Sequence, residues 1–282
     1  MKVHSLHIYP LKSGRVIDLA ASEVGAWGLE GDRRYMVTDR QGKFITQREL
    51  QALAQVTAVE ADGVLHLSKA GEDASLSAAF DPARRIDVEV WSSHVTAALA
   101  DDRVNATLSD WLGQSVKLVH ADAVTRRQCS TTWAGEGVET GFADGYPVLI
   151  TTTGSLRLLA EATMEEGGEA FGMDRFRPNI VIDHDAPFAD DFWSAVEIAG
   201  IRFDLVKPCA RCIMTTQDQS TGERGGPDPM PAMRKLRMST DRRVPGVLFG
   251  WNAVPRGSGT VRVGDGVSVV AERPDGWPVR LR

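Results

Sequence analysis

The sequence predicts a mostly β fold with a few helices, arranged as a barrel or a sandwich. Short segments in which polar and apolar residues alternate recur along the chain, and turn-forming residues separate them. Hydrophobic residues make up 43% of the chain and charged residues 25%, which is ordinary for a globular protein and argues against disorder. The length of 282 residues indicates two domains, at about 150 residues per domain.

Five segments of the first half are predicted to be strands, because polar and apolar side chains alternate along each of them. Gly42 lies in the short turn between the second and the third segment, so these two segments form a predicted hairpin. The five segments are residues 3–9, 34–38, 43–46, 64–67 and 86–90.

Residues 95–113 show a different pattern, in which apolar residues recur at close to helical spacing. Gly113 is placed to end this predicted helix. A strand is predicted again over residues 116–124. Because the pattern changes here, we place the domain boundary near residue 118, between a first domain of residues 1–118 and a second of residues 119–282.

The second half is predicted to contain one longer helix among strands. Thr152 and Ser155 are placed to begin this helix, and Gly167-Gly168 to end it. Ala199-Gly200 forms a tight turn within a predicted hairpin, and residues 223–231, rich in Gly and Pro, are predicted to be an exposed loop. The predicted strands are residues 146–150, 179–182, 196–198 and 201–206, and residues 260–270 are predicted to be a further hairpin.

Charge and hydropathy exclude several functional classes. The net charge of −6 gives no basic face for duplex nucleic acid. No run approaches the roughly 18 apolar residues of a membrane span, and the N-terminus lacks the continuous apolar core of a signal peptide. The chain is therefore expected to be cytoplasmic, with neither nucleic acid nor membrane as a partner. Nucleotide-binding motifs of the GxGxxG or Walker A type are absent from the sequence.

The densest chemical signal is the pair Cys209 and Cys212, separated by Ala-Arg. The chain has only three cysteines, so a disulfide framework is not expected and the thiols are free. A zinc site with Cys129 as a third ligand, a redox dithiol and inert buried cysteines are all compatible with this spacing. Residues 213–216 are predicted to be a strand, whereas a redox dithiol usually opens a helix. Lys207 and Arg211 favour the thiolate, a metal ligand or a nucleophile in sulfur transfer.

The segment Pro208–Gly222 resembles the central motif of the MOSC domain. Five further segments match the same family in order along the chain. Of these, the first two and residues 44–48 resemble the β-barrel domain that precedes MOSC in the amidoxime reducing component and YcbX-like branch. The resemblance implies an N-terminal β-barrel domain over residues 1–118 and a MOSC β-barrel domain over residues 119–282. The matching segments are residues 9–13, 31–35, 44–48, 176–181 and 260–265.

The resemblance also implies a cofactor, molybdenum held by a pyranopterin dithiolene that ends in a phosphate. By similarity Cys212 is the molybdenum ligand and a catalytic residue, Cys209 is its neighbour, and Asp144 is a catalytic residue that holds a metal-bound water or relays protons. A buried phosphate and pterin need hydrogen-bond donors, and Arg and Lys suit them. The implied cofactor-binding residues are Lys12, Ser13, Arg33, Arg177, Asn179 and Arg211.

The implied activity is molybdenum-dependent reduction of N-hydroxylated small molecules such as amidoximes and hydroxylamines. No cysteine set for an iron–sulfur cluster exists in the chain, so the electrons are expected from a separate reductase, ferredoxin or b-type cytochrome. No ferredoxin-like domain, membrane-targeting leader or pyridoxal-phosphate domain of the relatives is expected here. Residues 223–231 are expected to shape the substrate mouth. The alternatives are a carrier of molybdenum cofactor or sulfur, and a zinc-stabilised protein without redox activity.

Overall fold

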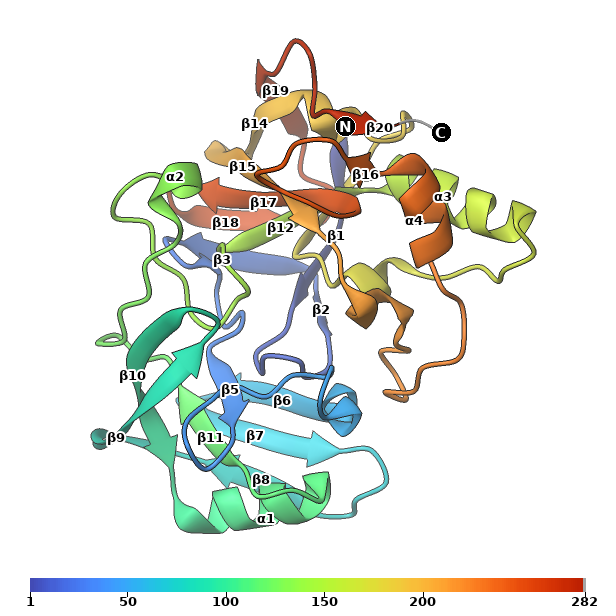
Figure 1. Ribbon diagram of the computed structural model, residues 1–282. Coiled ribbons are helices and arrows are strands. Elements are labelled where there is room, and N and C mark those ends of the chain that lie inside the picture. Colours follow the sequence, from blue (N-terminus) through green and yellow to red (C-terminus); the bar gives the residue numbers. More distant parts are fainter. Residues whose placement is uncertain (281–282) are drawn as a thin grey trace.

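The computed structural model describes residues 1–280. Strands account for 41% of the residues and helices for 19%, which confirms the predicted mostly β class. Figure 1 shows two stacked parts, an upper part built around a large curled sheet and a lower part of smaller sheets with one helix at its base. Within residues 1–280, no helix combines the length and the apolar character needed to cross a bilayer.

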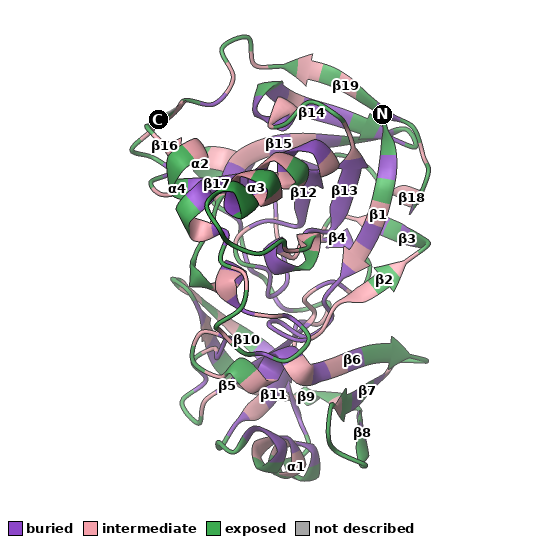
Figure 2. Ribbon diagram, turned by 90° about the vertical axis from the view of Figure 1, so that its right-hand side faces the viewer, coloured by how far each residue is buried: buried purple, intermediate pink, exposed green. Residues whose placement is uncertain are grey.

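The upper part is organised by an eight-stranded sheet. Two neighbouring strands of this sheet, β12 and β13, run parallel and are joined through helix α3 (Thr153–Glu165), since a parallel pair needs a crossover connection. Buried residues concentrate on these strands (Figure 2). In spatial order the strands are β19 (Val267–Glu272), β14 (Trp193–Ile198), β15 (Ile201–Ala210), β17 (Leu248–Pro255), β12 (Val148–Thr152), β13 (Ile180–Asp183), β1 (Lys2–Ile8) and β2 (Ile17–Leu19).

The predicted hairpin around Ala199-Gly200 is confirmed, because β14 and β15 pair directly on either side of that turn. The hairpin predicted over residues 260–270 is wrong. Gly264 and Gly266 carry the chain from one sheet to another, so β18 pairs with β3 while β19 pairs with β14. The smaller elements of the upper part are β3 (Ala21–Gly25), β4 (Gly28–Leu29), β16 (Met238–Ser239), β18 (Gly259–Arg262), β20 (Val279–Arg280), α2 (Thr131–Ala134) and α4 (Met230–Leu236).

The lower part contains a four-stranded and a three-stranded sheet, with α1 (Asp102–Leu112) packed against them through one apolar cluster. The helix predicted over residues 95–113 is correct only in its second half. Residues 93–100 form a strand because they hydrogen-bond to neighbouring strands on both sides, and Asp101 then caps α1 by accepting from the amide of Val104. The strands are β5 (Tyr35–Thr38), β11 (Lys117–His120), β10 (Ser93–Ala100), β9 (Phe80–Val90), β6 (Val56–Ala61), β7 (Val64–Lys69) and β8 (Ser75–Ala78).

Short 3₁₀ helices connect several of the larger elements. The strand predicted over residues 213–216 is wrong, since these residues form η4, in which the amide and hydroxyl of Thr215 both donate to the carbonyl of Cys212. Residues 43–46 make only isolated bridges to Thr38 and Glu89 instead of a full return strand. The 3₁₀ helices are η1 (Gln51–Gln55), η2 (Met173–Phe176), η3 (Ala189–Phe192) and η4 (Ile213–Thr216).

The N-terminal strands of the chain belong to the upper part. Strand β1 pairs with β13 and strand β3 with β18, so the first 25 residues belong to a sheet system built mainly from the second half of the chain. The domain boundary at residue 118 stays a prediction. Because residues 9–14 lead directly from the upper sheet toward β5, segments from both halves meet between the two parts.

Candidate functional site

A cavity of about 300 Å³ lies where the two parts meet. Its walls come from the segment after β1, from the loops around residues 33, 48 and 144, and from the end of β15 with the following η4. Every residue that the sequence singled out for the site lines this cavity. These residues are Lys12, Ser13, Arg33, Asp144, Arg177, Asn179, Cys209, Arg211 and Cys212.

Backbone strain is concentrated around the cavity. Among the described residues, seven residues other than glycine have a positive φ, and four of them line this cavity. A positive φ is costly for a side chain with a Cβ, and such residues persist mainly where the surrounding fold enforces them, often at functional sites. The four residues are Ser13, Arg33, Trp91 and Arg177.

The two cysteines stand at the end of strand β15. Cys212 is exposed and precedes η4, and Cys209 is partly buried. The Arg211 side chain connects Cys209 to η2, since its Nη1 donates to Cys209 Sγ at 2.9 Å and its Nη2 to the carbonyl of Phe176 at 2.7 Å. Its buried Nε has no hydrogen-bond partner within residues 1–280. One N–H of this guanidinium therefore remains available to a bound acceptor.

Two arginines lie over the ring of Tyr9. The guanidinium carbon of Arg33 lies 4.2 Å from the ring centroid and that of Arg177 4.1 Å. Arg33 is neutralised by Asp32 at 2.6 Å, whereas Arg177 donates Nη1 to the neutral amide of Gln219 at 2.9 Å. Burial lowers the pKa of Arg177 to about 10. Its Nη2 is buried without a partner in the described structure, so an anion beside it would satisfy both charge and hydrogen bonding.

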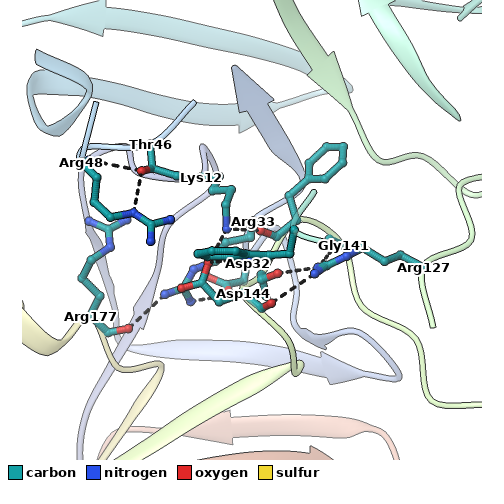
Figure 3. Close-up of polar contacts among 12 residues, drawn as sticks. Lys12, Asp32, Arg33, Thr46, Arg48, Arg127, Gly141, Asp144 and Arg177 are labelled. Carbon is teal, nitrogen blue, oxygen red and sulfur yellow. Dashed lines mark hydrogen bonds and ion pairs between the residues drawn. The ribbon is translucent and has the colours of Figure 1, made fainter. Parts of the chain in front are cut away.

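Lys12 and Asp144 form an ion pair at the base of the cavity (Figure 3), with Nζ 2.5 Å from Oδ1. Lys12 is only 4% exposed, and burial lowers its pKa although Asp144 opposes this. Partial removal from bulk water inside the cavity works to raise the pKa of Asp144, but the charge and hydrogen bond of Lys12 hold it well below its ordinary value. Arg127 braces the Asp144 loop by donating to the carbonyls of Gly141 and Asp144. The Asp144 carboxylate therefore faces the cavity, while Lys12 and the Arg127-bound loop hold it in place.

Asn179 differs from the other predicted cofactor-binding residues. Its Oδ1 accepts from the amide of Leu149 at 3.0 Å, and its Nδ2 donates to the carbonyl of His7 at 3.2 Å. The side chain thus ties strands β12 and β1 together at the cavity wall. Its role as a pterin donor stays a prediction.

Sequence reasoning missed part of the cavity wall. Thr46 and Arg48 fall in a segment that matched the family, but no role was assigned to them, and Trp91 and Arg175 carried no recognisable signal. All four line the cavity. Arg48 lies over the ring of Trp91, with its guanidinium carbon 4.5 Å from the centroid.

Two further expectations concern neighbouring residues. Residues 223–231 do not line this cavity, although Nη2 of Arg224 lies 3.5 Å from the carbonyls of Gln47 and Arg48, so their role at the substrate mouth stays a prediction. Lys207, which was expected to favour the thiolate, does not line the cavity, and its ammonium lies 5.6 Å from the ring centroid of Trp133.

The third cysteine is remote from this chemistry. Cys129 packs in an apolar cluster with Tyr146 and Val254, and burial raises the pKa of its thiol to about 11. This environment favours the inert thiol over a metal ligand. Within residues 1–280, no three His, Cys, Asp or Glu side chains are grouped so that they could hold a metal ion.

Comparisons with known proteins agree with this architecture. A family model described as the MOSC N-terminal beta barrel domain matches residues 1–115, and one described as the MOSC domain matches residues 138–268. The chain belongs to the MOSC family. This finding confirms the resemblance drawn from the cysteine motif and the segments around it.

Named MOSC proteins match over nearly the whole chain. Mitochondrial amidoxime-reducing component 1 of Mus musculus is 28% identical, covering 96% of this chain and 82% of the relative. The Homo sapiens protein of that name is 27% identical, covering 96% and 83%. Molybdenum cofactor sulfurase of Homo sapiens is 25% identical over 86% of this chain but only 29% of its own length.

Proposed function

We propose that this MOSC protein is a molybdenum cofactor-dependent oxidoreductase that reduces N-hydroxylated compounds with electrons from a separate donor protein. In this reaction the N–O bond of an amidoxime breaks, two electrons and two protons are taken up, and the amidine and one water are formed. The full-length similarity to amidoxime-reducing components supports this activity over sulfuration, because the sulfurase matches over less than a third of its length.

The charge of the cavity carries the proposal. Six cationic side chains line it against one carboxylate, that of Asp144. Buried N–H groups of Arg177 and Arg211 have no partner within the described chain. Such a set of donors fits a group that brings a phosphate and a polar pterin, since each unpaired buried donor is costly. The six cations are Lys12, Arg33, Arg48, Arg175, Arg177 and Arg211.

In this proposal Cys212 supplies the thiolate ligand, as the family resemblance implies, and its exposed position at the cavity wall supports that role. Arg177 and Arg211 bind the anionic part of the cofactor, and Arg33 supports Arg177 through Tyr9. The cofactor, when bound, supplies the two-electron redox chemistry. Asp144 is placed to accept or pass a proton at the cavity, with Lys12 holding it in its charged form.

The test is molybdenum analysis of protein produced in a host that makes the cofactor. We expect about one molybdenum per wild-type chain by analogy with one-cofactor enzymes, retention in Cys209→Ser and loss in Cys212→Ser. The unfolding midpoint of Cys212→Ser should equal that of cofactor-free wild-type protein. Full molybdenum in Cys212→Ser would refute the ligand assignment. Zinc in place of molybdenum in the wild type would favour the zinc-stabilised alternative.

The second measurement is reduction of an amidoxime with an artificial electron donor. Loaded wild-type protein should form the amidine, and Cys212→Ser should not. Loaded protein that binds molybdenum but reduces neither amidoximes nor hydroxylamines would instead support the carrier alternative.

A further inference from the structure

Trp91 occupies a backbone position that disfavours it. The hairpin of β9 and β10 has a two-residue turn, since Val90 pairs with Ser93, and Trp91 is its first central residue with φ of 56°. Ser92 has no positive φ. A positive φ at the first position alone matches the type II′ turn, where glycine is usual. A bulky side chain is strained there, and the proposed cofactor chemistry gives no reason for it.

The indole is nevertheless held in place from several sides. Its Nε1 donates to Asp144 Oδ1 at 3.4 Å, the ring of Phe44 lies 4.9 Å from it, and Arg48 lies over it at 4.5 Å. The backbone of Phe44 in turn donates to the carbonyl of Glu89 in β9, which fixes the hairpin to this segment. These contacts orient the ring without covering it, and the residue remains 40% exposed.

The contacts of Trp91 place it on the solvent-open side of the cavity, next to Asp144. The Asp144 side chain is 79% accessible and lies between the buried Lys12 and the partly exposed Trp91. A molecule that binds beside the Asp144 carboxylate therefore lies against the indole and the stacked Arg48. Both present flat surfaces, and a flat conjugated molecule gains from offset or edge-on packing against them beyond simple burial.

We infer that Trp91 is a specificity-determining residue that holds the aryl group of an aromatic N-hydroxylated substrate at the cavity mouth. This inference rests on the proposed function and narrows its substrate class to planar, conjugated compounds. The N–O group of such a substrate would then point inward, toward Asp144 and the cysteines.

The test compares benzamidoxime, an aryl substrate, with acetamidoxime, its alkyl counterpart. In Trp91→Gly, which suits the turn, we expect kcat/KM for benzamidoxime to fall about tenfold, mainly through KM, because aromatic packing of this size has that effect. The value for acetamidoxime should change less than about twofold. Trp91→Phe should keep most of the preference. Trp27→Phe, which alters an Arg–Trp stack outside the cavity, is the matched control.

Three readouts keep this test decisive. Molybdenum content and the unfolding midpoint should be unchanged in Trp91→Phe, so that an equal loss on both substrates in that variant assigns Trp91 to the fold or the cofactor and overturns the inference. Unchanged aryl preference in Trp91→Gly also overturns it. If the wild type reduces neither probe, the proposed function fails. The inference about Trp91 is then tested by calorimetric binding of benzamidoxime. Weaker binding to Trp91→Gly than to the wild type supports an aryl-binding role of Trp91, and equal binding refutes it.

Discussion

Lys12 and Asp144 control each other's ionisation at the base of the cavity. Lys12 is buried, so its charge is tolerated only because a carboxylate lies 2.5 Å away. Asp144 remains open to the cavity, with 79% of its side chain accessible. The pair therefore joins a buried cation to an accessible anion. Removal of the anion and removal of the cation should have different consequences for stability.

Replacement Asp144→Asn should destabilise the fold at pH 7 by about 1–3 kcal/mol, because it leaves a buried ammonium with neutral acceptors such as the carbonyl of Phe142 and without its counter-charge. The pKa of Lys12 is already lowered in the fold, so the unfolded chain binds this proton more tightly. The loss should hence shrink as the pH rises toward 10. Urea unfolding at both pH values measures it. The double variant Lys12→Met/Asp144→Asn should be more stable than Asp144→Asn alone, and equal stability would refute the coupling.

Asp190 is a second residue whose protonation contributes to stability. Burial, together with the charge of Asp191, raises its pKa to about 7. The folded protein thus holds this proton more tightly than the unfolded chain. The resulting stabilisation is complete at acidic pH and is lost as the pH rises through about 7. Arg237 donates to both carboxylate oxygens of Asp191.

Asp190→Asn should therefore remove a pH-dependent penalty. At pH 8 the variant should be more stable than the wild type by about 1–4 kcal/mol, and at pH 5 the difference should be much smaller. Urea unfolding at the two pH values gives both differences. A constant difference across this range would show that Asp190 is ionised in the fold throughout.

The residues of the site were predictable only where they lie in segments that match the family. The cysteine motif and the segment around Lys12 predicted one shared site although about 200 residues separate them in the sequence. This was possible because both segments match the same family. Trp91 was not predictable. Its sequence context, Val-Trp-Ser-Ser, is unremarkable, and only the positive φ and the contacts with Asp144 and Arg48 reveal it.

At the scale of elements, the turn between β14 and β15 offers a direct test of local sequence preference. Ala199 and Gly200 both have positive φ, at 51° and 76°, which is the pattern of a type I′ turn. Alanine is strained at the first position, whereas asparagine tolerates it. Ala199→Asn should raise the free energy of unfolding by about 0.5–1 kcal/mol, measured by urea unfolding. Ala199→Val, which worsens the strain, should lower it, and a stabilising valine would contradict the argument.

Elements were predictable where the local pattern and the tertiary pairing agree. Strands β1, β5, β7 and β13 alternate or form buried runs in sequence, and each was predicted as a strand. Strand β10 ends in the run Ala97–Ala100, which is buried throughout and mimics a helical pattern, so only its two neighbouring strands reveal it. Whether two strands form a hairpin or join different sheets depends on partners far along the chain, which a local pattern does not contain.

For the whole molecule, the important feature is that charge gathers between the two parts. The chain is acidic overall, with a net charge of −6, yet the cavity lining carries six cations against one carboxylate. Like charges in a partly buried space repel one another with little screening. The fold tolerates this repulsion through Tyr9, Asp32 and backbone carbonyls, but the buried donors of Arg177 and Arg211 remain unsatisfied within residues 1–280.

An anion that enters the cavity should therefore stabilise the whole molecule. For cofactor-free protein, we expect phosphate at about 50 mM to raise the unfolding midpoint by a few degrees, since a ligand that binds only the folded state stabilises it by mass action. Chloride at equal ionic strength should have a smaller effect, because it screens charge without accepting several hydrogen bonds. Arg177→Met should lose most of the phosphate effect, whereas Arg157→Met, which removes an arginine outside the cavity, should retain it. An equal phosphate effect in both variants would place the anion outside the cavity and remove the support that the charge distribution gives to a phosphate-bearing cofactor.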